Sequence, residues 1–150
     1  KKPRSEVLGR RADGSLAGAA THDLAAISEN YVVMRFDASL VFINAAHFEQ
    51  AVLKSLSEFP RARAILIIGQ GINRIDATGE EKLRALTRDL QAAGVTLLLS
   101  GLKKPVIQAL ERANLEAVIG KENIISNKEA ALRVLAQRYP EDEVKQVQVA

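Results

Sequence analysis

Two short apolar runs, separated by a helix-length segment, dominate the middle of this sequence. The runs are Ala64–Ile68 and Val95–Leu99, and each is apolar at nearly every position. Strands that are covered on both faces have this composition, as in parallel sheets. Between the runs, Leu83, Leu86 and Leu90 recur at helical spacing. The pattern predicts a βαβ unit with a right-handed crossover, and therefore an α/β fold.

The residues before this unit add strands and one helix to the prediction. The β-branched and aromatic content of Tyr31–Phe36 is typical of a strand, and Glu6–Gly9 is a candidate for a short one. We expect Val41–Ile43 to be a second strand that pairs with Tyr31–Phe36 as an antiparallel hairpin. Asn44 is then expected to cap a helix that ends before Pro60.

The residues after the unit continue the alternation of helices and strands. Pro105 is suited to the first turn of a helix, because its fixed φ angle matches the helix and its missing N–H is not needed there. A short strand is expected at Ile124–Ile125. The sequence Ser126–Glu129 has the S-x-x-E pattern of a capping box, with Ser126 as the cap of a final helix.

A length of 150 residues predicts one domain. We divide the chain into a basic lead-in with the first short strand at 1–11, a loop at 12–29, a domain body at 30–140 and a polar tail at 141–150. The chain begins with Lys1 rather than Met, so we expect it to be a piece of a longer protein.

The charge distribution argues against nucleic acid as a partner. Residues 1–11 carry five cations and one carboxylate, a net +4, which leaves −1 for the rest of a chain whose total is +3. The basic excess therefore belongs to the terminus and not to a folded face. Tryptophan is absent and aromatic residues make up 4% of the chain, too few for a stacking platform. The lead-in is either a solvated terminus or a segment that flanks a membrane.

Thr78 is the residue on which the functional interpretation depends, because it lies where a strand gives way to a helix. The first backbone N–H groups of a helix have no partner within the helix. In one interpretation Thr78 caps the helix through the T-x-x-E pattern that ends at Glu81. In the other, its exposed hydroxyl is a switch that a kinase modifies, and Asp76 and Glu80 oppose the added charge.

The loops that follow parallel strands lie at one edge of a sheet, where ligands gather. We therefore expect Thr78 and the loop from Ser100 to Lys104 to form one surface. Lys103 and Lys104 precede a helix and are candidates for binding an anion or a nucleotide, although two solvated loop lysines are the commoner arrangement. The sequence offers no metal-ligand spacing, no cofactor motif and no catalytic set, so we predict neither a metal nor a cofactor nor an enzyme.

Four segments together resemble the STAS domain family. That family includes the bacterial anti-sigma factor antagonists and the cytoplasmic C-terminal domains of sulfate-permease (SulP) type anion transporters. The segments are Arg35–Leu40 followed by Phe42–Ala45, Ile72–Gly79, Ser100–Lys104 and Ile119–Ile124. The resemblance implies a mixed sheet of about 4–6 strands with about 4–5 helices packed mainly on one face. The segments are more similar to the transporter branch.

The resemblance also implies roles for residues. Asp76 and Thr78 match the acidic and the phosphorylated positions of the antagonists, and the interaction edge would comprise Asn73, Arg74, Gly79, Ser100 and Gly101. The expected function is a non-catalytic regulatory domain of a sulfate-like anion transporter at the cytoplasmic face of the bacterial inner membrane. Its partner would be the transporter's membrane domain or a cytoplasmic regulatory protein. The alternative is a free-standing anti-sigma factor antagonist that is switched at Thr78.

Overall fold

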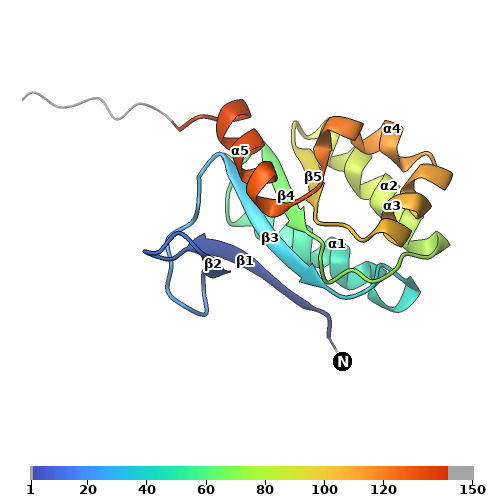
Figure 1. Cartoon of the computed structure of the whole chain (residues 1–150), viewed down its shortest axis with the longest axis horizontal. Coiled ribbons are helices and arrows are strands. Elements are labelled where there is room, and N and C mark those ends of the chain that lie inside the picture. Colours follow the sequence, from blue (N-terminus) through green and yellow to red (C-terminus); the bar gives the residue numbers. More distant parts are fainter. Residues whose placement is uncertain (1, 142–150) are drawn as a thin grey trace, which may run out of the picture.

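The computed structural model describes residues 2–141, which form one six-stranded mixed sheet with helices around it (Figure 1). The strands are β1 Arg4–Arg10, β2 Leu16–Gly18, β3 Tyr31–Asp37, β4 Ala64–Ile68, β5 Thr96–Ser100 and β6 Ile124–Ile125. The helices are α1 Phe42–Ser57, α2 Ala77–Ala92, α3 Lys104–Arg112, α4 Leu115–Ile119 and α5 Lys128–Arg138, with a 3-10 turn, η1, at Lys121–Asn123.

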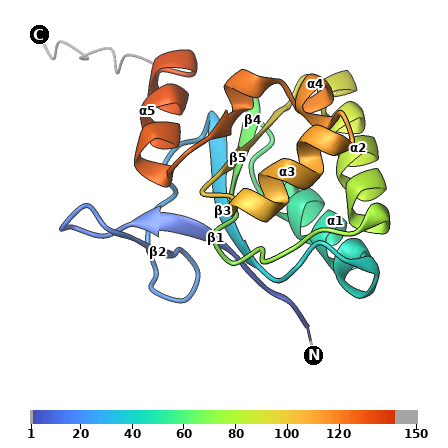
Figure 2. The ribbon, with the colours of Figure 1, turned by 45° about the vertical axis from the view of Figure 1, so that its right-hand side comes forward.

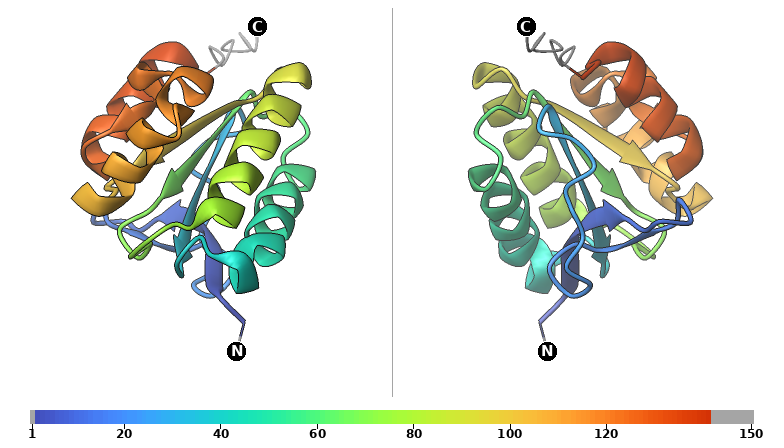
Figure 3. Two further views of the ribbon diagram at one scale, coloured as in Figure 1. Left: turned by 90° about the vertical axis from the view of Figure 1, so that its right-hand side faces the viewer. Right: turned by 90° about the vertical axis from the view of Figure 1, so that its left-hand side faces the viewer.

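The strand order is β2-β1-β3-β4-β5-β6. Strands β3 to β6 are parallel, and β1 runs antiparallel to both β2 and β3. All five residues of β4 are buried, as the apolar run predicts for a central parallel strand. The βαβ unit β4-α2-β5 is confirmed. Because β3, β4 and β5 run the same way, their carboxyl ends lie at one end of the molecule, near the N-terminus (Figure 3).

The two faces of the sheet are covered unequally (Figure 2). Helices α1 to α4 contribute to one core on the first face, through side chains such as Phe48, Leu86, Leu110 and Leu115. Helix α5 covers the other face with Leu135. The predicted mixed α/β sheet with helices mainly on one face is confirmed. Among the described residues, no helix has both the length and the apolar character that crossing a membrane requires.

The predicted strand at Val41–Ile43 was wrong. Phe42 and Ile43 form the first turn of α1, Val41 is the N-cap residue, and Leu40 makes only an isolated parallel bridge with Ile75. Asn44 does not cap the helix either, because its amide donates to the backbone oxygen of Ser39 at 3.0 Å. A β-branched and aromatic triplet resembles a strand locally, but here its backbone is held by a distant part of the chain.

Two further local predictions need correction, and two short elements were not predicted. The segment 12–29 contains the short strand β2, whose Ala- and Gly-rich composition gave no strand signal. The cap of α5 is Asn127, whose side-chain oxygen accepts the Ala130 N–H at 2.8 Å, and not Ser126. Helix α4 and the turn η1 were not predicted. The predicted polar tail at 141–150 lies outside the described residues, apart from Glu141.

Candidate functional site

The candidate site lies at the carboxyl ends of the parallel strands. We call it the carboxyl-end rim: the loops that follow β3, β4 and β5, together with the first turns of α1, α2 and α3. Two of these loops touch, because the Lys103 ammonium donates to the side-chain oxygen of Asn73. Below them, the Gly69 N–H donates to the Ser100 backbone oxygen at 2.8 Å. The structure therefore places the Thr78 loop and the Ser100 loop side by side, as parallel neighbouring strands require.

Asp76 organises this rim through hydrogen bonds to two helices. One carboxylate oxygen accepts the Gly79 N–H at 2.8 Å and so caps α2, while the other accepts the Phe42 N–H at 3.0 Å, at the start of α1. These two backbone donors, Gly79 first, hold the pKa of the Asp76 carboxyl below its ordinary value, and the Arg74 cation adds to the effect. One side chain thus satisfies unpartnered N–H groups on both helices.

The interpretation of Thr78 as the cap of α2 was wrong. The helix begins at Ala77 and its N-cap residue is Asp76, so Thr78 occupies the second helical position. Its side chain is exposed and lines a shallow hollow on α2 with Ala77, Glu81, Lys82 and Ala85. An aspartate two residues earlier was the better acceptor for the free N–H groups, and this leaves the Thr78 side chain facing outward.

Gly79 is buried because the chain after β3 passes directly over it. A Cβ atom built at this position would overlap the Leu40 carbonyl oxygen, and would lie 2.7 Å from the Leu40 carbonyl carbon and 3.1 Å from Ile75 Cγ1. The Leu40 N–H donates to the Arg74 backbone oxygen, and the Leu40 oxygen accepts the Asp76 N–H, so the backbone at Leu40 is fixed there. The glycine is therefore needed for close approach.

Ser100 and Gly101 lie under the rim and contribute little to its surface. Ser100 is fully buried, and its hydroxyl has no hydrogen-bond partner among the described residues. Gly101 has a φ of +69°, and its N–H donates to the Ile125 backbone oxygen at 3.2 Å. Of the predicted interaction edge, Asn73 and Arg74 are exposed, whereas Gly79 and Ser100 are buried and support the loops from beneath.

Lys103 and Lys104 stand at the start of α3 and are exposed. Lys103 is the N-cap residue of that helix and has no side-chain bond to it, so the first N–H groups of α3 lack a side-chain cap. The contact with Asn73 holds the Lys103 ammonium across the neighbouring loop. Two cations and a helix start are present, which is the chemistry that attracts anions.

The sequence pattern missed an exposed apolar pair on this rim. Phe42 and Ile43 expose 77% and 79% of their surface, although both were expected to pair within a strand. They protrude from the first turn of α1, beside the Asp76 carboxylate that binds the Phe42 N–H. Large apolar side chains in contact with water at adjacent positions are a common mark of an interaction surface.

A comparison with protein families finds that the model of the STAS domain matches residues 24–148. Among curated relatives, High affinity sulfate transporter 2 of Stylosanthes hamata is 25% identical over 133 residues, which is 82% of this chain and 20% of the relative. A probable sulfate transporter of Mycobacterium tuberculosis is 26% identical over 108 residues, which is 71% of this chain and 19% of the relative. The chain thus spans about a fifth of the length of these relatives.

Solved structures share the fold. The murine Slc26a9 anion transporter superposes with a TM-score of 0.80 at 16% identity, over 92% of this chain and 23% of that one. The STAS domain of a SulP transporter from Vibrio cholerae gives 0.62 at 23% identity, over 79% and 91% of the two chains. A putative anti-sigma factor antagonist from Thermotoga maritima gives 0.61 at 16% identity, over 73% and 90%. At these identities the likeness concerns the fold alone.

Proposed function

Because this chain belongs to the STAS domain family, we propose that it is the non-catalytic regulatory domain of a SulP-type transporter for an inorganic, sulfate-like anion. It acts at the cytoplasmic face of the bacterial inner membrane. The carboxyl-end rim docks against the transporter's membrane domain or against a cytoplasmic regulatory protein, and Thr78 is the position at which this contact is controlled.

The observation that carries the proposal is the exposure of Thr78 beside an exposed apolar pair. Asp76 already satisfies the start of α2, so the Thr78 hydroxyl is left outside the helix cap and faces away from the core. Phe42 belongs to the same hydrogen-bonded junction. A hydroxyl that is not needed for the fold, next to apolar side chains that are not buried by it, fits a contact surface. The relatives named as sulfate transporters favour a transporter setting.

A free-standing anti-sigma factor antagonist, switched by phosphorylation of Thr78, is the second candidate. The exposed hydroxyl and the fold shared with the Thermotoga maritima protein favour it. The surrounding charge opposes a permanently bound phosphate, because the Asp76 carboxylate already occupies the start of α2 and Glu80 and Glu81 follow. A phosphate on Thr78 would therefore disturb the rim strongly, as a switch requires.

Transport by the full-length protein tests the first proposal. We expect Thr78→Glu to reduce sulfate uptake in proteoliposomes, because the new carboxylate is repelled by Asp76 and Glu80 and disturbs the docked rim. Thr78→Val keeps the shape without the charge and should transport normally. Thr21→Glu places the same charge on an exposed loop residue away from the rim and is the matched control.

Two results would contradict these statements. Wild-type uptake by the Thr78→Glu transporter would remove the rim from its regulation. Turnover of a nucleotide by the 150-residue chain, at a rate that depends on Lys103 and Lys104, would replace the non-catalytic role with an enzymatic one.

A further inference from the structure

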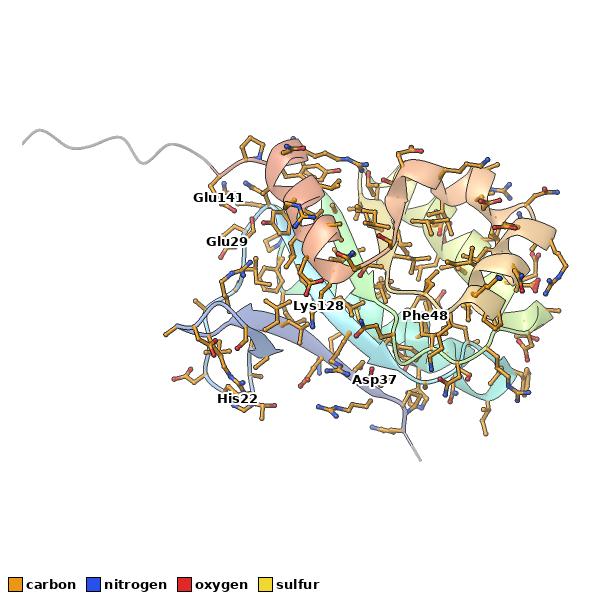
Figure 4. All side chains as sticks on the ribbon, viewed as in Figure 1. His22, Glu29, Asp37, Phe48, Lys128 and Glu141 are labelled. Atoms are coloured by element: carbon orange, nitrogen blue, oxygen red, sulfur yellow. The ribbon has the colours of Figure 1, made fainter. Side chains whose placement is uncertain are left out.

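The N-terminus of the chain lies at the same end of the molecule as the carboxyl-end rim (Figure 3). The register pairs Arg4 with Asp37, so the residues before β1 lie beside the carboxyl end of β3. Figure 4 shows Asp37 at this end of the molecule. The loops after β4 and β5 bring further cations to it. Arg74, Lys103 and Lys104 are exposed cations of the rim, and Lys2 and Arg4 are exposed beside it.

The carboxylates on this rim are half-buried or paired. Asp37 accepts from the Arg35 guanidinium at 2.8 Å and lies 3.9 Å from that of Arg4. Asp76 accepts two backbone N–H groups. Glu80 is half-buried in the first turn of α2, and Glu81 after it pairs with Arg84 at 3.3 Å. The outermost groups of the rim are therefore mainly cations.

The exposed apolar pair lies on the same rim, beside the Asp76 carboxylate. Phe42 and Ile43 begin α1, next to the start of α2, and their side chains are more than three-quarters exposed. Apolar side chains that protrude among lysines and arginines fit the boundary of an anionic bilayer, because the rings and alkyl groups enter the headgroup layer while the cations meet the phosphates.

We propose that the carboxyl-end rim binds the anionic lipid surface of the membrane, with Phe42 and Ile43 inserted among the headgroups while the exposed cations at this end of the molecule meet the lipid phosphates. The Asp76 bonds fix the first turn of α1, so the apolar pair is presented on a rigid support. The N-terminus lies at this end of the molecule (Figure 1).

Co-sedimentation of the 150-residue chain with vesicles tests this surface. One set of vesicles contains phosphatidylcholine with about 30% phosphatidylserine, and the control vesicles contain phosphatidylcholine alone. We expect binding to the anionic vesicles only, weakened by salt because exposed charges are screened. Phe42→Ser/Ile43→Ser should lower the affinity at least tenfold, and Lys103→Gln/Lys104→Gln should lower it roughly fivefold per lysine.

Matched variants control for general effects. Leu53→Ser removes an exposed apolar side chain of α1 outside its first turn, and Lys54→Gln/Lys121→Gln removes two lysines outside the rim. Both should bind as the wild type does. Thermal melting of each variant confirms that it is folded, so that a loss of binding reports on the surface.

Three outcomes would overturn the proposal. These are no binding to anionic vesicles, unchanged binding of the Phe42→Ser/Ile43→Ser variant, and equal losses in the rim and control variants. If vesicle binding fails while the same apolar variant impairs uptake by the full-length transporter, the rim contacts protein and not lipid. The inference rests on the membrane setting of the proposed function, but binding is measured on the chain and transport on the full-length protein, so each can fail separately.

Discussion

Replacing Gly79 by alanine has two effects on the stability of the fold, and they are opposite in sign. Position 79 lies in the first turn of α2, and alanine in a helix is favoured over glycine by about 1 kcal/mol. The structure predicts the reverse, because a Cβ atom there would overlap the Leu40 carbonyl. That carbonyl belongs to backbone and cannot rotate away as a flexible side chain would.

The size of the loss follows from what must move. Overpacking a tight site destabilises by about 1–3 kcal/mol. Shifting Leu40 also weakens its two backbone hydrogen bonds, each worth about 0.5–1.5 kcal/mol. In one, the Leu40 N–H donates to the Arg74 oxygen at 3.0 Å, and in the other the Leu40 oxygen accepts the Asp76 N–H at 3.1 Å. After the helix-propensity gain, we expect the free energy of unfolding to fall by about 3 kcal/mol, and the melting temperature by roughly 6–12 °C.

Thermal melting followed by circular dichroism measures this change. Gly94→Ala is the matched control, because Gly94 has a φ of +80° and no atom lies within 4 Å of a Cβ built there. Its free energy of unfolding should fall only by the strain of an alanine in the left-handed region, about 1–2 kcal/mol. If Gly79→Ala melts at or above the wild-type temperature, the close approach of Leu40 does not constrain the site and the reasoning is refuted.

Two other substitutions examine the junction and the core. Asp76→Ala should lower the melting temperature at pH 7, and the difference from the wild type should shrink as the pH falls. The pKa of Asp76 lies below its value of 3.8 in the unfolded chain, so the carboxylate stabilises the fold above pH 3.8. This stabilisation is lost as the pH falls through the lower pKa of the folded state. A difference that does not change between pH 7 and acid would contradict the role of the charge. Phe48→Ala should destabilise the fold by about 3–5 kcal/mol, because Phe48 is fully buried and packs edge-on against Phe36 with 5.1 Å between the ring centroids. Leu53 is exposed, so Leu53→Ala should not destabilise the fold in this way. Equal melting shifts for the two variants would contradict the assigned core.

The sequence predicted the elements that are governed by local pattern. The continuous apolar runs of β4 and β5, and the helical spacing of Leu83, Leu86 and Leu90 between them, identify a βαβ unit without knowledge of the rest. Once those strands are parallel, the meeting of their carboxyl ends follows from topology. That is why the juxtaposition of the loops that carry Thr78 and Lys103 could be predicted.

The errors arise where distant residues decide the local structure. The start of α1 depends on Asp76, 34 residues further along the chain, and no signal near Phe42 reports that partner. Its apolar triplet therefore had the appearance of a strand. Thr78 and Asp76 both match the composition of helix caps, and only the three-dimensional positions show which accepts the Gly79 N–H. The burial of Ser100 likewise follows from its neighbours in the sheet.

The Asp76 junction also links the proposed control position to the proposed membrane contact. The same carboxylate binds the start of α2, where Thr78 is exposed, and the start of α1, where Phe42 and Ile43 protrude. A negative group on Thr78 therefore acts on the hydrogen bonds that fix the apolar pair, and it adds an anion to a surface that faces anionic lipid. Both effects oppose contact with the membrane. If the proposals hold together, Thr78→Glu should weaken vesicle binding in the isolated chain as well as uptake in the full-length transporter, and Thr78→Val should leave both unchanged.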